Sequence, residues 1–338
     1  MLDQRRPQAE RGLQQLFSKS GIFSGLLVAA LVVGAQRLIS GLPDREAQPD
    51  RVAAVTFTPV RLPPVRLATS EPTLRIAGAW RVTSSEPRFG GLSALAVDRG
   101  ALLALTDSGV VVRMPRPGGA RSMATFRDLP DGPGDPRRKS RRDSEALARL
   151  ADGDWLVAFE NRNQLWRYDP AFRSGRRVVA FTNQGWPTNR GIEAMTIDRE
   201  GGVLLIPEGR GTLIALGNRG EYHSLANDGW TVSDAARLPD GRQYLLLRRI
   251  TIWGVRNAIG ELEPNAAGWR IAVRARLPIG VLDNAEGMAA EPIPGGGTRL
   301  WIVTDNDFAG YRRTLLLALE LVMPNPSSPD LSARRRAT

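Results

Sequence analysis

Residues 189–209 read NRGIEAMTIDREGGVLLIPEG. The apolar run 192–197 and the β-branched, apolar run 203–206 predict two short strands, and residues 198–202 between them are typical of a tight turn. An antiparallel hairpin places the start of its first strand beside the end of its second strand. The sequence therefore predicts a hairpin that brings Glu193 and Glu208 to the same edge of a sheet.

The same hairpin pattern recurs along the chain. Further copies begin at Ser93, Glu145, Asp234 and Glu286, and the starts lie between 41 and 52 residues apart. Repeats of this length, each rich in short strands, are typical of propeller blades. We therefore predict an all-β fold, a single β-propeller with five four-stranded blades. Six blades are the alternative, if a degenerate blade lies within 85–121 or 257–274.

The last repeat lacks one strand. Only residues 314–321 follow its hairpin as a strand, whereas residues 74–83 form a predicted strand without a hairpin of their own. Pairing these two segments would close the ring with strands from both ends of the chain and would leave no exposed edge. We therefore expect the N-terminal strand to complete the last blade.

The segments on either side of the propeller have different compositions. Residues 1–39 join a basic start to an apolar run at 22–35, which suits a signal peptide and is short for a membrane span. We expect a signal peptide or an N-terminal membrane anchor, and hence an exported protein, either periplasmic or anchored to the inner membrane facing the periplasm. The other predicted segments are a Pro-rich linker at 40–73, the propeller domain at 74–322 and a disordered basic tail at 323–338.

Composition excludes several kinds of chemistry. The 338 residues include no cysteine, which excludes disulfides, thiolate metal sites and cysteine nucleophiles. The one histidine, His223, falls in an outer strand of the third blade, so zinc and a serine–histidine triad are disfavoured. The net charge of +11 comes from scattered arginines, and no basic helix with interleaved aromatics is present. We expect a monomer that binds no nucleic acid.

Two columns of side chains should converge at one mouth of the central channel, because the loops that enter each first strand and leave each second strand lie on one face. The first column contains Ser93, Glu145, Glu193, Asp234 and Glu286, and the second contains Asp107, Glu160, Glu208, Arg248 and Asp305. Closely spaced carboxylates repel one another unless protons, arginines or a metal ion neutralise their charge. A hard divalent cation such as Ca²⁺ or Mg²⁺ suits such a ring. The predicted ligands are Glu145, Glu193, Glu208, Glu286, Asp305, Asp107, Glu160 and Asp234. The alternative for any single carboxylate is a structural bond to backbone amides of a neighbouring blade.

Four paired phrases carry a family resemblance. They are FGGLSAL (89–95) with LTDS (105–108), DSEAL (143–147) with FEN (159–161), NRGIEAM (189–195) with PEG (207–209), and NAEGM (284–288) with VTDNDF (303–308). In this order they resemble the phytase-like family described by the esterase-like activity of phytase, over roughly residues 74–321. The resemblance implies a β-propeller of exported bacterial proteins and metal-dependent hydrolysis of phosphoesters or esters.

Two functions follow as hypotheses. The first is an exported, metal-dependent hydrolase of a small anionic or ester substrate, with Ca²⁺ as the expected cation and no other cofactor. Its catalytic candidates are Glu193, Glu145, Glu286 and Arg248, and Arg190 with the loop 137–142 would also bind a negative group. The second hypothesis is a non-catalytic ligand- or protein-binding propeller of the cell envelope. The fold hosts both classes, so the sequence leaves open whether the domain is an enzyme.

Overall fold

The structure, a computed structural model, consists of β-strands. It describes residues 46–67, 73–118, 121–135, 142–181, 191–209, 211–217, 220–279, 283–306, 308 and 312–322. Within these ranges no residue is helical, and no helix that could cross a membrane is found there. The predicted N-terminal segment 1–39 and the predicted tail 323–338 lie outside the described residues.

The strands are short and follow one another closely along the chain. Their bounds are β1 Arg51–Pro59, β2 Arg66–Leu67, β3 Thr73–Ser84, β4 Leu92–Asp98, β5 Ala101–Thr106, β6 Val110–Met114, β7 Arg121–Asp128, β8 Ser144–Arg149, β9 Trp155–Phe159, β10 Gln164–Tyr168, β11 Gly175–Ala180, β12 Ile192–Ile197, β13 Val203–Pro207, β14 Thr212–Leu216, β15 Glu221–Ala226, β16 Thr231–Arg237, β17 Gln243–Thr251, β18 Gly254–Asn265, β19 Gly268–Arg276, β20 Asn284–Pro292, β21 Thr298–Asp305 and β22 Leu315–Val322.

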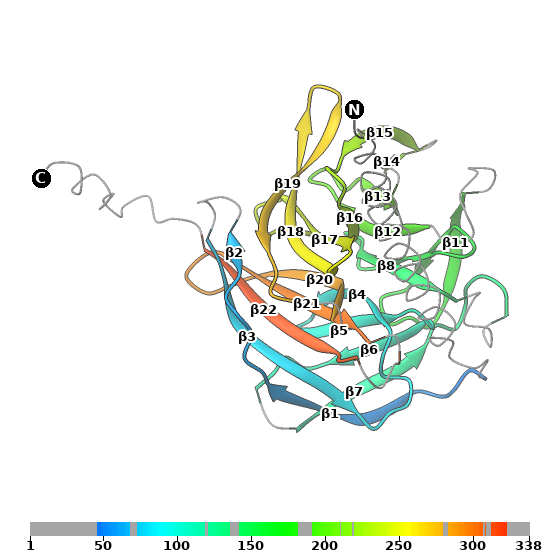
Figure 1. Cartoon of the computed structure of the whole chain (residues 1–338). Helices are drawn as coiled ribbons and strands as arrows, with labels where there is room; N and C mark the ends of the chain where they lie inside the picture. Colours follow the sequence, from blue (N-terminus) through cyan, green and yellow to red (C-terminus); the bar gives the residue numbers. More distant parts are fainter. Residues whose placement is uncertain are drawn as a thin grey trace, which may run out of the picture.

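The inner strands β4, β8, β12, β16 and β20 form the centre of the molecule (Figure 1). Each contacts the next, and β20 contacts β4, which closes a ring. From each inner strand the following strands of the chain pair outward in antiparallel order, as in β8-β9-β10-β11. This architecture confirms the predicted all-β propeller.

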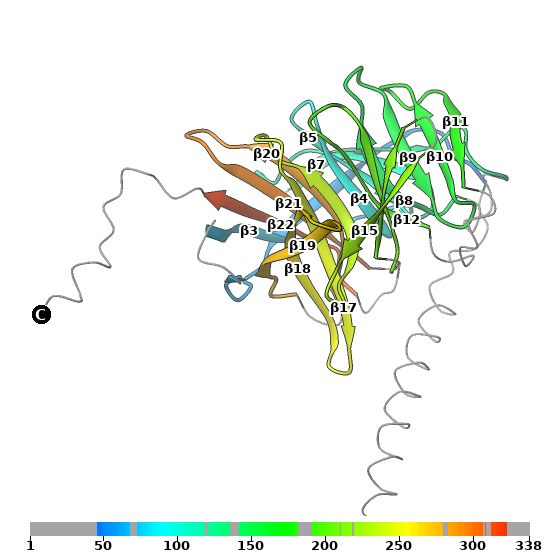
Figure 2. The same cartoon turned by 90° about the horizontal axis from the view of Figure 1, so that it is seen from above.

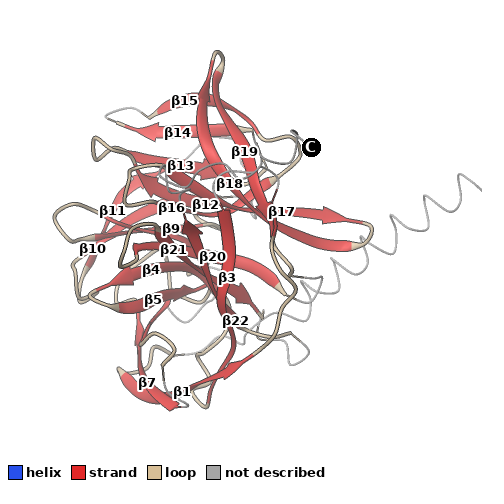
Figure 3. Cartoon of the chain, turned by 90° about the vertical axis from the view of Figure 1, so that its left-hand side faces the viewer, coloured by secondary structure: helices blue, strands red, loops and turns tan. Residues whose placement is uncertain are grey.

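Outer strands join neighbouring units into larger sheets. β1 lies between β3 and β7, and β15 pairs in parallel with β19. The hydrogen-bonded sheets therefore do not separate into single blades, and the division into five blades remains an interpretation of the strand order. Figure 3 shows the strands of these sheets from the side.

The N-terminal strand closes the last unit, as predicted. β3 pairs antiparallel with β22, with Leu74 opposite Leu321 and Arg81 opposite Leu315. Leu74, Leu315 and Leu321 are buried in the core between this unit and its neighbour. The first and last parts of the domain are thus held together by backbone hydrogen bonds and by apolar burial.

The linker predicted at 40–73 contains a structural strand that sequence reasoning missed. β1 spans nine of these residues and pairs with both β3 and β7. Its inward-facing Val55 and Phe57 are buried. The alternation of this segment was obscured by its prolines. Pro49 and the prolines at 63 and 64 lie outside the strand, and Pro59 is its last residue, so none interrupts it.

We expect Val55→Thr to lower the free energy of unfolding by about 1–2 kcal/mol, because it places an unpaired hydroxyl in an apolar site. Val55 has no exposed surface, whereas Val52 on the same strand is 60% exposed. Val52→Thr is the matched control and should change stability by no more than about 0.5 kcal/mol. Denaturant unfolding measures both variants. Equal, small effects would show that β1 is not part of the cooperative fold.

In the fourth unit a tight turn joins β17 and β18, with Thr251 opposite Gly254. Trp155, Trp230 and Trp301 are buried, whereas Trp253 at this turn is exposed. His223 lies on the outer strand β15, as predicted.

Candidate acidic site at the inner-strand bulges

A β-bulge recurs at the start of every inner strand. The pairing register shifts across Ser93, Glu145, Glu193, Ser233 and Glu286. A bulge inserts an extra residue and redirects its side chain, and bulges are frequent beside functional sites. The fourth member of the first column is therefore Ser233, one residue before the predicted Asp234. Pattern matching missed this shift because both residues are polar and adjacent.

Backbone hydrogen bonds close the open ends of three of the hairpins. The amides of the second-column residues donate to carbonyl oxygens just before the first-column residues, over 2.8–3.0 Å. These bonds join Asp107 to Gly91, Glu160 to Asp143 and Glu208 to Gly191. The entry of each of these inner strands is thus fixed beside the exit of its partner.

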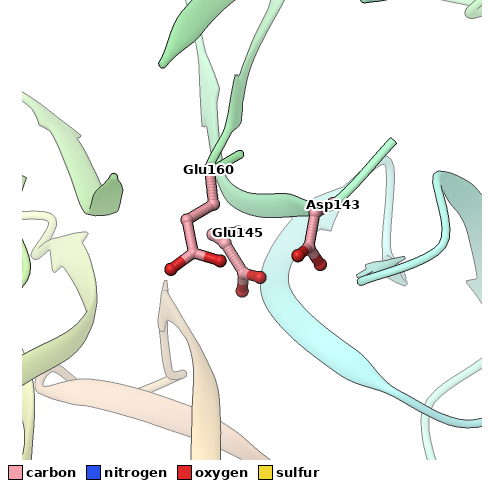
Figure 4. Close-up of side chains that lie close together, drawn as sticks. All are labelled: Asp143, Glu145 and Glu160. Carbon is pink, nitrogen blue, oxygen red and sulfur yellow. The ribbon is translucent and has the colours of Figure 1, made fainter. Parts of the chain in front are cut away.

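Two groups of carboxylates share Glu160. In the first group Asp143, Glu145 and Glu160 each place a carboxylate oxygen within 4.8 Å of the other two, and in the second Glu160, Glu193 and Glu208 do the same. Figure 4 shows the first group, with the three carboxylates turned toward a common space. Asp143 was missed as a candidate, although it directly precedes the strand of Glu145 in the DSEAL phrase.

The pKa values of two of these acids are raised. Burial is the main cause for Glu145, and the charges of Asp143, Glu193, Glu160 and Asp107 raise its pKa further. Burial also raises the pKa of Glu193, which is only 8% exposed, against the opposing charge of Arg248. Without a cation, both groups therefore hold protons well above their ordinary titration range.

Arg248 is a counter-charge to several of these carboxylates. It forms an ion pair with Glu286, and its guanidinium lies 3.6 Å from Glu208. The charge of Glu286 is the main cause of the raised pKa of Arg248, and Glu193 and Glu208 add to it. Asn284 donates a further hydrogen bond to Glu286. Glu286 is thereby engaged by protein donors and lies outside both carboxylate groups.

Asp234 binds backbone amides of neighbouring strands, which is the structural role given above as the alternative for any single carboxylate. Its side chain is buried and accepts hydrogen bonds from the amides of Ala235, at 2.8 Å, and Met288, at 2.7 Å. Burial raises the pKa of Asp234, while these bonds and one from the Leu95 amide lower it. Since Met288 is on β20 and Leu95 is on β4, Asp234 joins three inner strands of the ring.

The remaining predicted residues take varied positions. Asp107 is near enough to Glu145 to raise its pKa, and Asp305 is buried at the end of β21, outside both carboxylate groups. Ser93 donates to the Ser144 carbonyl at 2.6 Å and so links β4 to β8. Arg142 is buried and donates to the carbonyls of Leu129 and Asp131, so it holds its own loop rather than the mouth. Arg190 and residues 137–141 lie outside the described residues.

The carboxylate groups fit a hard divalent cation. Oxygen ligands lie about 2.3–2.6 Å from Ca²⁺, so two oxygens bound to one ion are separated by at most about 5 Å. The separations within each group are no more than 4.8 Å. Carboxylate oxygens are also the donors that Ca²⁺ and Mg²⁺ prefer. Either group is therefore suited to such an ion in size and in chemistry.

A family described as "Phytase-like: Esterase-like activity of phytase" matches residues 87–308, which is more than half of the chain. Among solved structures, the chain is similar to the PQQ-bound aldose sugar dehydrogenase of Streptomyces coelicolor, at 13% identity over 75% of this chain and 99% of that one, with a TM-score of 0.46. It is also similar to a gluconolactonase of Xanthomonas campestris, at 15% identity over 83% and 99%, with a TM-score of 0.42. The Malassezia sympodialis allergen Mala s 1 matches at 12% identity over 84% and 98%, with a TM-score of 0.44. No curated protein sequence matches the chain.

Proposed function

Because the chain belongs to the phytase-like family described by the esterase-like activity of phytase, we propose that it is a divalent-cation-dependent hydrolase of phosphoesters or carboxylic esters. The observation that carries the proposal is the pair of carboxylate groups joined by Glu160, which we place at the predicted mouth of the propeller. Its substrate would be a small anionic or ester molecule that reaches the mouth from solvent.

The group Asp143, Glu145 and Glu160 is the better cation site. The other group contains Glu208, whose carboxylate lies 3.6 Å from the Arg248 guanidinium, and Glu193, whose pKa Arg248 lowers. A positive charge so close opposes a second cation. Glu145 interacts with Arg248 more weakly, because its charge comes after those of Glu286, Glu193 and Glu208 among the causes of the raised pKa of Arg248, while burial and four acids raise the pKa of Glu145. Ca²⁺ is the expected ion, because the ligands are all carboxylates and Ca²⁺ tolerates irregular geometry.

Each side chain near the carboxylate groups has a separate role in the proposed reaction. A bound divalent cation would polarise a substrate oxygen and lower the pKa of a water molecule. Glu193 is buried, and its pKa is raised mainly by that burial, so it is suited to proton transfer. Arg248 is suited to orient an anionic group, and Glu286 holds its guanidinium in place. Glu145 serves as a ligand to the cation in this arrangement.

We expect Ca²⁺ to stabilise the protein and to be required for turnover. At a concentration 100 times its Kd, an ion that binds only the native state stabilises it by about 2.7 kcal/mol. For a domain of this size that corresponds to a rise in Tm of about 5–10 °C. Thermal unfolding of the full chain with Ca²⁺ and with chelator measures the shift, and chromogenic phosphoesters and carboxylic esters measure turnover in the same samples.

Glu160→Gln should abolish the Ca²⁺-dependent shift in Tm, because both carboxylate groups lose a ligand. Glu221→Gln, at an exposed position of β15, should leave it unchanged.

The chelated protein should also lose stability as the pH rises. The pKa values of Glu145 and Glu193 in the folded state lie above their ordinary value of 4.5. Their contribution to stability is therefore fully present below 4.5 and is lost as the pH rises through the folded-state pKa values. Ca²⁺ should flatten this dependence, because it compensates the ionised carboxylates.

Three outcomes separate the hypotheses. If chelator leaves the wild-type Tm unchanged while Glu193→Gln raises it, the carboxylates are merely crowded and the cation site is wrong. If chelator lowers the Tm but no phosphoester or ester is hydrolysed, the cation is structural and the non-catalytic binding propeller is correct. Turnover that survives chelation would contradict the role of the cation in hydrolysis.

A further inference from the structure

The hairpin of β17 and β18 extends beyond the rest of its sheet. The pairing of β16 with β17 ends at Thr231 opposite Arg248, whereas β17 and β18 stay paired as far as Thr251 opposite Gly254. Residues 249–256 therefore form a two-stranded finger, which projects from the body of the molecule in Figures 2 and 3. Because Arg248 belongs to the acidic mouth, the finger rises from the same end of the propeller.

The tip of the finger is apolar and exposed. Ile250, Ile252 and Trp253 are 65%, 78% and 80% exposed. They are three of the seven large hydrophobic side chains that are exposed in the described part of the chain. Asn and Gly are the usual residues of a two-residue hairpin turn. The turn itself is held by Thr251, whose hydroxyl donates to the Gly254 carbonyl and accepts from the Trp253 amide. The turn does not require these large side chains for its own stability.

The base of the finger is fixed and basic. Arg249 donates to the Gly229 carbonyl at 3.1 Å, and its guanidinium lies 4.3 Å from the centre of the buried Trp230 ring. The only charged residues of the finger are Arg249 and Arg256, which are direct cross-strand partners. Like charges at such positions are destabilising. The finger thus has an apolar tip, and its two arginines lie together at its base.

We propose that this finger inserts its tip into the interfacial region of an anionic lipid membrane. Tryptophan is enriched at the boundary between lipid and water, and arginines next to an apolar segment are attracted to anionic headgroups. A stable protein interface buries about 800 Å² on each partner, which is more than three side chains on a narrow convex tip supply. A membrane surface needs only a small inserted apolar area with basic residues around it.

Insertion would orient the acidic mouth toward the membrane. Trp253 is five residues beyond Arg248 along the hairpin, which corresponds to roughly 16 Å for extended chain. The mouth would then face the lipid headgroups across a short gap. This orientation is independent of whether the mouth hydrolyses its ligand.

Tryptophan fluorescence of the full chain tests the proposal. Vesicles of phosphatidylglycerol and phosphatidylcholine with brominated acyl chains quench tryptophans that enter the bilayer. Residues 1–45 contain no tryptophan, so membrane binding by that segment adds no quenched signal of its own. We expect Trp253→Phe to lose most of the quenching that the wild type shows. Trp269→Phe, which removes a half-buried tryptophan from β19, is the matched control and should keep it.

A second variant separates insertion from simple proximity. Ile252→Asp should reduce the quenching of Trp253, because it places a negative charge at the inserted tip, and its Tm should stay that of the wild type since the position is exposed. Equal quenching of the wild type and Trp253→Phe would overturn the proposal, as would equal losses in Trp253→Phe and Trp269→Phe. No quenching by the brominated vesicles, with or without phosphatidylglycerol, would also overturn it. None of these readouts depends on hydrolysis, so failure of the proposed enzymatic function leaves them unaffected.

Discussion

Replacing Arg248 by methionine is expected to lower the free energy of unfolding by about 3–5 kcal/mol, because removal of one partner from a buried ion pair leaves the other charge uncompensated. Arg248 and Glu286 are both largely buried, and Glu208 is the second acid within reach of the guanidinium. Methionine preserves most of the side-chain volume, so the loss reports charge rather than a cavity. Denaturant unfolding at pH 7 in the presence of chelator measures the change.

Two comparisons make this result specific. Arg256→Met, on the exposed part of the neighbouring strand, should change stability by no more than about 0.5 kcal/mol. The double variant Arg248→Met with Glu286→Gln should recover a large part of the loss, since it removes both charges of the pair. A loss below about 1 kcal/mol at pH 7 would mean that the mouth does not depend on Arg248 for charge balance.

Replacing Asp234 by alanine is expected to cost about 4 kcal/mol, because each buried amide left without a partner costs about 1–3 kcal/mol. The carboxylate is 1% exposed and accepts from Ala235 and Met288, on β16 and β20. Asp234→Asn retains one acceptor oxygen, so its loss should be smaller than that of Asp234→Ala. Thermal and denaturant unfolding give both values.

The matched control for Asp234 is Asp240→Ala. Asp240 is partly exposed in the turn after β16 and is paired with Arg242, so its removal should cost little. Cation binding offers a second check, because Asp234 lies outside both carboxylate groups. Asp234→Asn should therefore keep the Ca²⁺-dependent rise in Tm. Loss of that rise with unchanged stability would make Asp234 a ligand rather than a link between strands.

The sequence by itself determined the fold class and the closure of the ring. Alternating strands and turn residues are local features, and their recurrence every 41 to 52 residues requires no knowledge of distant contacts. The sequence also predicted the closing pair of β3 and β22, because the last repeat lacked a strand and the N-terminal strand belonged to no repeat. The strand β1 did not follow, since it belongs to no repeat and its prolines are those of a linker.

The sequence also identified which residues stand at the open ends of the hairpins, but only the tertiary structure decided which of them share space. Glu160 lies with Asp143 and Glu145 in one group and with Glu193 and Glu208 in another, whereas Glu286 is bound by Arg248 and Asp234 by backbone amides. The physical reason is that a repeat makes positions equivalent, while the contact between two side chains also depends on the bulge that redirects each one and on the neighbouring unit it then meets. Those distances are set when the ring closes, and no local pattern contains them.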